Sequence, residues 1–418
     1  MRGEFRLLGE KVVVTGTEEE VFGKGYGRKK GRLELSLEEA AFLLETGRLQ
    51  IKQLNFKEFL EHALSVSPRF GVRYLVYRDL KDRGYAVQPA GGGGGRGGGR
   101  GGGRGGGRGG GGVGFWLYPR GAKPGEKPAK YFIRIFSELD FLALSELGEL
   151  LALAENMRKE SILAVVDAES DVTYYELKEA KFEGLQGEKK AGKRERGEEE
   201  EEQEEKQEEE QEEEQEEEEE QGKEEKKKAK VSLLGDRVVL LDSGLAESLY
   251  KKHFYGKLTK ERRLLLSFVE ATYLSKAGLL ETSFKQFVEH ATAVESDFLE
   301  KYAVYEDLRA NGLVVKTGFK FGSHFRVYKA GQQKHSSYLI HVLPKEHIFS
   351  LPELSRAVRL AHGVRKRMIF AHQTFREQTF RKSLIKSNNA SLQPFRKSLI
   401  KNASLQKVFY VEVGRKKL

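Results

Sequence analysis

The feature that most constrains the fold of this chain is a long internal repeat. Four stretches of the first half return in the second half in the same order, 226 to 231 residues further along. They are LLGEKVVV (7–14) and LLGDRVVL (233–240), LSLEEAAFLLETG (35–47) and LSFVEATYLSKAG (266–278), NFKEFLEHA (55–63) and SFKQFVEHA (283–291), and YLVYRDLKDRGYAV (74–87) and YAVYEDLRANGLVV (302–315). A period of this length indicates two copies of a whole domain rather than the short units of a solenoid.

The two copies, residues 1–182 and 231–418, are each expected to fold as an α+β unit. The apolar residues of 37–45 recur at helical spacing, and Gly47 stands where a glycine often ends a helix. Segments 56–63 and 74–84 predict two further helices, and a long helix is expected over 351–368. Strands are expected before and after this long helix. We therefore expect two tandem homologous units, each an α/β N-terminal subdomain plus a mixed β-sheet C-terminal subdomain flanked by helices.

Three segments depart from the repeat. Residues 183–230 are a linker rich in Glu, Gln and Lys, a composition too polar to offset the entropy of folding. The Gly/Arg tract 91–112 interrupts the first copy between two expected strands, either as a tolerated loop expansion or as a weak, sequence-blind RNA contact. The insert 372–407 of the second copy contains a duplicated basic phrase, and we leave its role open.

The charge of the chain favours a polyanionic partner. The total is +9, but residues 198–220 contain 18 Glu and one Lys and alone carry −17, which leaves +26 for the rest. A surplus of this size is typical of proteins that bind nucleic acid, since each cation facing a phosphate releases a counterion. The alternative is the charge-rich surface of a heat-adapted protein.

Composition and motifs also exclude several classes. There are no cysteines, which removes disulfides, thiolate nucleophiles and cysteine-ligated zinc. No apolar run approaches the roughly 18 residues of a membrane span, so we expect a soluble, cytoplasmic protein. The histidines lack metal-ligand spacing and no phosphate-binding loop motif is present, so we expect neither a metal nor a cofactor.

The chain resembles a known family, the archaeal tRNA-splicing endonucleases, over most of residues 1–90, 113–182, 231–371 and 408–418, and most specifically in one part of the second copy. The resemblance lies in YAVYEDLRANGLVVKTGFKFGSHFRVYKAG (302–331), HSSYLIHVL (335–343) and SRAVRLAHGVRKRMIFA (355–371). These phrases occur in order and at the family's spacing. The tandem arrangement is similar to the homodimeric class of the family, in which a degenerate first unit precedes a catalytic second one.

The resemblance implies a catalytic trio of Tyr328, His335 and Lys366. RNA carries its own nucleophile, the 2′-hydroxyl, so cleavage needs a base, an acid for the departing 5′-oxygen and positive charge beside the phosphorane. In the family a tyrosine is the proposed base, a histidine is suited to the acid role, and a lysine neutralises charge. The products implied are a 2′,3′-cyclic phosphate and a 5′-hydroxyl, with no metal required. Taken singly, each of the three would be an ordinary strand, loop or helix residue.

The first copy provides an internal control. Tyr118 in FWLY aligns with Tyr328, and Lys159 aligns with Lys366. Pro128 stands where the histidine belongs. The acid is therefore missing, and we expect the first copy to be catalytically silent.

Further residues follow from the resemblance alone. Arg359, seven residues before the lysine, and Arg415 are candidates for the two arginines that clamp a bulged base in the family, although Arg359 is equally explained as an exposed helix charge. Glu138 and Asp140 lie where the family has an acidic loop that docks onto another chain, although acids before a helix also favour its N-terminus.

The function implied is that of a metal-independent endoribonuclease, of the transesterifying lyase type, that removes introns from precursor tRNA at bulge–helix–bulge sites as a homodimer. The rival is a non-catalytic RNA-binding or assembly protein that uses the basic surface and the Gly/Arg tract.

Overall fold

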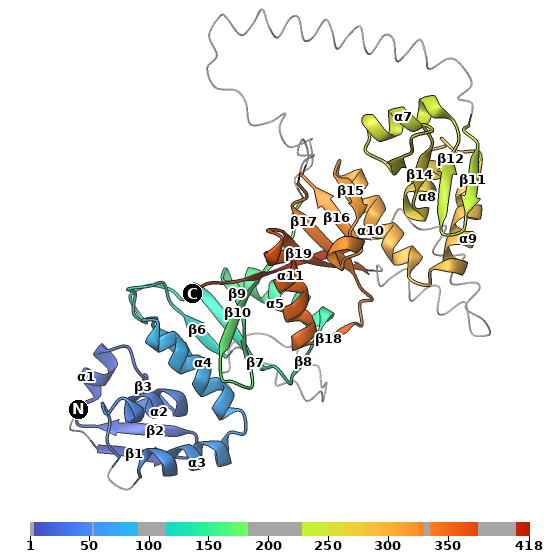
Figure 1. Ribbon diagram of the computed structural model, residues 1–418. Coiled ribbons are helices and arrows are strands. Elements are labelled where there is room, and N and C mark those ends of the chain that lie inside the picture. Colours follow the sequence, from blue (N-terminus) through green and yellow to red (C-terminus); the bar gives the residue numbers. More distant parts are fainter. Residues whose placement is uncertain (1–3, 52–53, 91–113, 183–227, 330–334, 375–406) are drawn as a thin grey trace, which may run out of the picture. The chain divides into compact units, whose positions relative to one another are not determined.

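The described part of the chain forms two compact units. The computed structural model describes residues 4–51, 54–90, 114–182, 228–329, 335–374 and 407–418 (Figure 1). Unit 1 comprises Met1–Ala180, Lys345–Met368 and Val411–Leu418, and unit 2 comprises Lys181–Pro344 and Ile369–Tyr410. The Gly/Arg tract, the linker up to residue 227 and residues 375–406 of the insert lie outside the described residues. Residues 372–374 and 407, at the ends of the predicted insert, belong to strands.

The order of elements repeats along the chain. The first copy contains β1 (Glu4–Leu8), β2 (Lys11–Thr15), α1 (Glu18–Gly23), β3 (Arg28–Lys30), β4 (Arg32–Ser36), α2 (Leu37–Glu45), α3 (Phe56–Val66), α4 (Phe70–Asp82), β5 (Val87–Pro89), β6 (Phe115–Leu117), β7 (Tyr131–Ser137), β8 (Phe141–Ala143), α5 (Leu144–Met157), β9 (Glu160–Val166) and β10 (Val172–Glu179). The second copy contains β11 (Val231–Leu234), β12 (Arg237–Leu240), α7 (Ser243–Lys251), β13 (Lys257–Leu258), β14 (Leu264–Leu266), α8 (Phe268–Lys276), α9 (Phe284–Val294), α10 (Phe298–Ala310), β15 (Val314–Thr317), η2 (Phe319–Phe321), β16 (Phe325–Tyr328), β17 (Tyr338–Val342), β18 (Ile348–Ser350), α11 (Leu351–Gly363), β19 (Arg367–Thr374) and β20 (Lys407–Arg415). Every helix and strand of the first series has a counterpart in the second, which confirms the tandem α+β prediction.

The N-terminal part of each copy is a four-stranded antiparallel sheet with helices. The strand orders are β1-β2-β4-β3 in unit 1 and β11-β12-β14-β13 in unit 2. Ser36 caps α2 through a capping box with Glu39, and Ser267 caps α8 in the same way with Glu270. The glycine after α2, Gly47, has φ +67°, a left-handed conformation that glycine adopts without steric cost. Local signals therefore set these helix ends; the glycine was predicted from the sequence and the capping boxes were not. The short helices α1 and α7 were not predicted.

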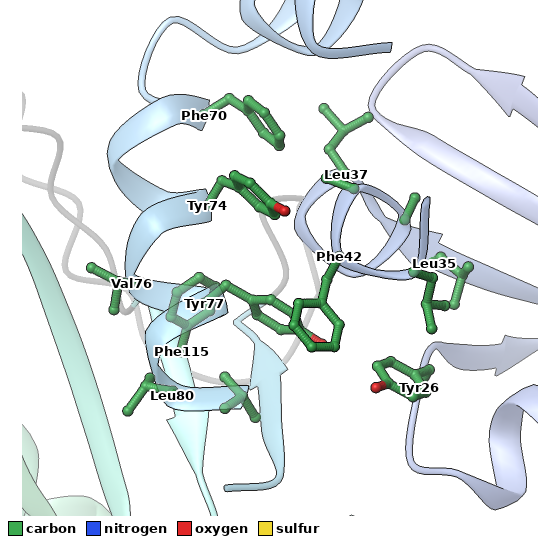
Figure 2. Packing of buried hydrophobic residues seen from close by; sticks show 14 of the residues in the cluster. Tyr26, Leu35, Leu37, Phe42, Phe70, Tyr74, Val76, Tyr77, Leu80 and Phe115 are labelled. Carbon is green, nitrogen blue, oxygen red and sulfur yellow. The ribbon is translucent and has the colours of Figure 1, made fainter. Parts of the chain in front are cut away.

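Aromatic residues join the N-terminal helices to the C-terminal sheet. Tyr77 on α4 is completely buried and packs edge-on against Phe42 of α2, with ring centroids 6.0 Å apart, and against Phe115 of β6 at 5.7 Å (Figure 2). Tyr305 makes the equivalent contacts in unit 2. Burial of such rings is a large part of the hydrophobic stabilisation of each core.

The C-terminal part of each copy is a mixed sheet. In unit 1 the order is β10-β9-β7-β6-β5, with β7 and β9 parallel and the other pairs antiparallel. Helix α5 connects β8 to β9 and so forms part of the crossover that two parallel strands require. In unit 2 the corresponding order is β15-β16-β17-β19.

The compact units do not coincide with the two sequence copies. Unit 1 contains the second-copy elements β18 and α11 and the last residues of β20. Strand β18 pairs antiparallel with β8, and residues Val411–Arg415 of β20 pair with β10. The Tyr175 hydroxyl of β10 donates to Ser355 Oγ of α11 at 2.9 Å. Contacts that are distant in sequence decide this division, and the repeat pattern alone does not contain them.

Among the described residues, none of the helices combines the length and the apolar character that crossing a bilayer requires.

Candidate active site

Tyr328 and His335 lie on either side of the short connection between β16 and β17 in unit 2. Tyr328 ends β16, where it is paired with Val314 of β15. The Ser337 N–H donates to the Val327 carbonyl at 2.9 Å, which brings the start of β17 beside the end of β16. Tyr328 is half-buried and His335 is exposed, so solvent reaches both residues. Residues 330–334 between them lie outside the described part of the chain.

Lys366 occupies a turn, and the predicted helix over 351–368 is too long at its C-terminal end. Helix α11 ends at Gly363, and Arg365 adopts a left-handed conformation with φ +56°. The Lys366 N–H then bonds back to the Ala361 carbonyl at 2.8 Å, and β19 begins at the next residue. The backbone hydrogen bonds of this left-handed turn satisfy carbonyl groups at the end of the helix. Lys366 is half-buried and belongs to unit 1 by contact clustering.

The strand register gives the first-copy counterpart of each residue. In β6 and β7, Leu117 pairs with Tyr131, as Val327 pairs with Tyr338 in β16 and β17. Counting one residue forward from Leu117 gives Tyr118 for Tyr328, and counting three back from Tyr131 gives Pro128 for His335.

The lysine turn is also repeated. In the first copy Arg158 has φ +53°, and the Lys159 N–H bonds to the Ala154 carbonyl at 2.9 Å. Lys159 is therefore the geometric equivalent of Lys366. The structure thus gives the same three correspondences as the sequence alignment, by an independent route.

The phenol of the first copy is enclosed and hydrogen-bonded. Tyr118 is only 8% exposed, and its hydroxyl donates to Gln88 Oε1 at 3.0 Å. Burial raises the pKa of Tyr118, although the nearby Arg28 guanidinium acts in the opposite direction. A phenol held in this way keeps its proton and is shielded from a bulky substrate.

The lysine of the first copy reaches the place of the missing histidine. Lys159 Nζ donates to the carbonyl of Ala129 at 2.8 Å, and Ala129 directly follows Pro128. The same ammonium lies 5.7 Å from the ring centroid of Trp116, two residues before Tyr118. Within unit 1, the lysine position therefore lies next to the histidine position and to the strand that carries the tyrosine.

The two candidate base-clamping arginines are both in unit 1. Arg359 is exposed on α11, and its Nη2 is 3.4 Å from Ser355 Oγ, the atom that accepts from Tyr175. Arg415 is exposed at the end of β20 and is paired in register with Tyr175. Both positions therefore adjoin the same tyrosine.

The acidic residues of the predicted assembly loop differ from one another. Asp140 accepts two hydrogen bonds from the Arg69 guanidinium, at 2.7 and 3.2 Å, and one from the Ser137 N–H at 2.8 Å. Its carboxylate is therefore already used within unit 1. Glu138 is half-buried, and Leu139 beside it is 81% exposed.

Comparison with known proteins decides the family. The family model described as the tRNA intron endonuclease N-terminal domain matches residues 3–60 and 229–288, and the model described as the tRNA intron endonuclease, catalytic C-terminal domain, matches residues 108–174 and 298–379. A protein of Methanosarcina mazei named tRNA-splicing endonuclease is 39% identical over 389 residues, which cover 89% of this chain and 93% of the relative. The chain belongs to the tRNA intron endonuclease family.

Other relatives carry the same name. A Haloarcula marismortui protein is 35% identical over 361 residues, or 84% of this chain and 88% of the relative. A Methanosarcina barkeri protein is 39% identical over 384 residues and covers 88% and 93%. Each domain of the family thus occurs twice in this chain, in agreement with the repeat.

One residue beside the candidate site was not predicted. Arg326 lies two residues before Tyr328 on β16, and its guanidinium carbon is 5.8 Å from the Tyr328 ring centroid. The first copy has Trp116 at this position. The difference between FRVY and FWLY is visible in the sequence. Only the structure shows that Arg326 lies beside the phenol of Tyr328.

Within the described ranges, no group of three or more His, Cys, Asp or Glu side chains is placed to hold a metal ion.

Proposed function

We propose that this tRNA intron endonuclease removes introns from precursor tRNA with the second copy as its catalytic copy. The observation that carries the proposal is the contrast between two equivalent positions. The second copy presents Tyr328, His335 and Lys366 to solvent, whereas the first copy has a buried phenol and a proline in place of the histidine. Both copies have the same fold, but only the second has a histidine to act as the acid. We therefore expect one catalytic site in each chain.

The three residues divide the work of a transesterification. Tyr328, in its deprotonated form, accepts the proton of the 2′-hydroxyl, whose oxygen forms a bond to phosphorus. The bond from phosphorus to the 5′-oxygen breaks, and His335 gives that oxygen a proton. Lys366 neutralises the charge on the phosphorane. The products are a 2′,3′-cyclic phosphate and a 5′-hydroxyl, and no metal ion takes part.

Contacts within the first copy support the assignment of these three positions to one site. There the lysine ammonium donates to the residue next to the histidine position and lies 5.7 Å from an aromatic ring of the tyrosine strand. The second copy repeats both the strand register and the left-handed lysine turn. Each of the three residues of the second copy therefore has the same local backbone setting as its counterpart in the first copy.

We also propose that the substrate is read by shape. An RNA with two bulges separated by a fixed A-form helix matches two catalytic copies held at a fixed distance, which requires a homodimer. Arg359 and Arg415 would stack on an unpaired base. Of the predicted assembly loop, Glu138 would contact the second chain, while Asp140 holds the loop in shape through Arg69.

The decisive experiment is cleavage of one end-labelled intron-containing transcript, with and without EDTA. We expect two cuts at the bulges, cyclic phosphate ends and an unchanged rate in EDTA. Binding without cleavage would favour the rival RNA-binding protein, and loss of cleavage in EDTA would point to a metal-dependent nuclease. Sedimentation of the active protein should give a dimer. Full activity from a monomer would contradict the proposed assembly.

A further inference from the structure

Arg326 is held close to the phenol of Tyr328 on one face of β16. Residues two apart on a strand point to the same face, and the guanidinium carbon of Arg326 is 5.8 Å from the Tyr328 ring centroid. Arg326 is half-buried, and its Nε is both covered and without a hydrogen-bond partner among the described residues. Covered guanidinium N–H groups normally have acceptors, since leaving one unsatisfied costs roughly 1–3 kcal/mol.

The residue opposite Arg326 is another cation. Lys316 of β15 is its register partner, and Lys316 Nζ donates to the Gly256 carbonyl at 2.9 Å. Burial lowers the pKa of Lys316, the charge of Glu270 opposes this, and Arg326 is among the cations that lower it further. Like charges directly opposite one another on a sheet are unfavourable. Among the described residues, no carboxylate forms an ion pair with Arg326 that would relieve this repulsion.

The silent copy lacks both charges. The equivalent register pair is Gln88 with Trp116, and Gln88 accepts the hydrogen bond of the Tyr118 hydroxyl. The register pair beside the buried phenol is therefore neutral, whereas two cations occupy the equivalent positions beside the accessible one. A repulsive pair is expected where an anion completes the arrangement, and the anion that this family handles is an RNA phosphate.

We propose that Arg326 binds a phosphate of the RNA substrate beside Tyr328 and is a fourth residue of the active site. This inference rests on the proposed function. Arginine suits the role because its planar fork of N–H groups matches two phosphate oxygens. Lys316, fixed on the Gly256 carbonyl, would hold the arginine on the side of the phenol by repulsion.

The test compares Arg326→Met and Arg326→Lys with Lys285→Met, which removes one exposed cation from α9 of the same unit. Single-turnover cleavage of the precursor tRNA transcript should fall at least about tenfold in Arg326→Met, with partial recovery in Arg326→Lys and no change in Lys285→Met. If Arg326→Met folds poorly, Arg326→Trp introduces the residue that the first copy holds at this position.

The second readout is the salt dependence of binding, measured with the same variants in a His335→Ala background so that the RNA stays intact. Loss of one phosphate contact should reduce the slope of log affinity against log salt by roughly 0.7 to 0.9 in Arg326→Met only. A purely structural arginine would lower the melting temperature and leave the slope unchanged, which would overturn the proposal. Wild-type protein that does not cut the transcript would instead overturn the proposed function.

Discussion

Tyr118 directly follows β6 and Tyr328 ends the equivalent strand β16, and the surroundings of the two side chains differ. Tyr118 is buried and bonded to a neutral amide, whereas Tyr328 is half-exposed beside the guanidinium of Arg326. The backbone that carries them is the same, down to the register of the next strand. The same fold therefore positions a phenol in both copies, and the neighbouring side chains decide how buried it is and which charges lie beside it.

Away from the site the copies have changed much less. Tyr174 on β10 donates to Asp79 of α4 at 2.6 Å, and Tyr410 on β20 donates to Asp307 of α10 at 2.7 Å. The stacked tyrosine cores are also repeated. Residues that hold helix to sheet are thus present in both copies, whereas the proposed catalytic trio is complete only in the second. The comparison can be tested position by position.

The largest effect is expected at the histidine position. His335→Ala should reduce the cleavage rate by roughly 10³-fold with binding of the precursor tRNA retained, because the leaving 5′-oxygen loses its proton donor. Pro128→Ala is the matched variant of the first copy and should leave the rate unchanged. Single-turnover cleavage and filter binding measure the two quantities. Equal losses in both variants would mean that the copies share the chemistry.

Restoring the histidine to the first copy is a sharper form of the same test. Pro128→His in a His335→Ala background should give no cleavage above that background, since Tyr118 remains buried and bonded to Gln88. Recovery of cleavage would show that the missing acid alone silences the first copy.

The two phenols should also respond differently. Tyr328→Phe is expected to lower the cleavage rate by roughly a hundredfold without loss of stability, because it removes the proton acceptor from a half-exposed position. Tyr118→Phe should leave the rate unchanged and cost about 1 kcal/mol of unfolding free energy through the lost bond to Gln88. Cleavage assays combined with urea denaturation separate these outcomes. A stability loss in Tyr328→Phe with a normal rate would reverse the comparison.

The repeat made most of the fold predictable. Helix ends such as Gly47 carry local signals, and the alignment of FRVY with FWLY already paired Tyr118 with Tyr328. The end of α11 was missed because the left-handed turn at Arg365 depends on backbone hydrogen bonds rather than on a glycine. The ion pair of Asp140 with Arg69 joins residues that are 71 apart in the sequence, and no pattern in either segment predicts it.

The tyrosine–aspartate pairs should show a smaller difference. Tyr410→Phe is expected to cost about 2 kcal/mol of unfolding free energy, because Tyr410 is the one side chain among the described residues that bonds the Asp307 carboxylate. Tyr174→Phe should cost about half as much, since Asp79 keeps the guanidinium of Arg83 at 2.8 and 3.1 Å. Urea denaturation measures both. Equal costs would mean that Arg83 contributes nothing to holding Asp79.

The smallest effect is expected on stability when the pH is lowered, and it depends on a histidine that the first copy lacks. His324 precedes β16, its Nδ1 accepts the Val342 N–H at 2.9 Å, and its ring stacks on His341 at 4.5 Å. Burial lowers the pKa of His324 to about 4, with the charges of His341 and Lys301 acting in the same direction and Asp297 opposing them. The first copy has Gly114 in place of His324, so it has no titrating group there.

The sign of the pH effect follows from the two states. The unfolded chain takes up a proton on this histidine near its ordinary pKa of 6.5, whereas the folded chain resists protonation until about pH 4. The stability due to neutral His324 is therefore present above pH 6.5 and is lost as the pH falls from 6.5 to 4, by an amount on the order of 1 kcal/mol for a partly exposed group. His324→Gln keeps an acceptor for Val342 and removes the titration. The unfolding free energy of this variant should fall less between pH 7 and pH 4.5 than that of the wild type, and an identical fall in both would place the acid sensitivity elsewhere.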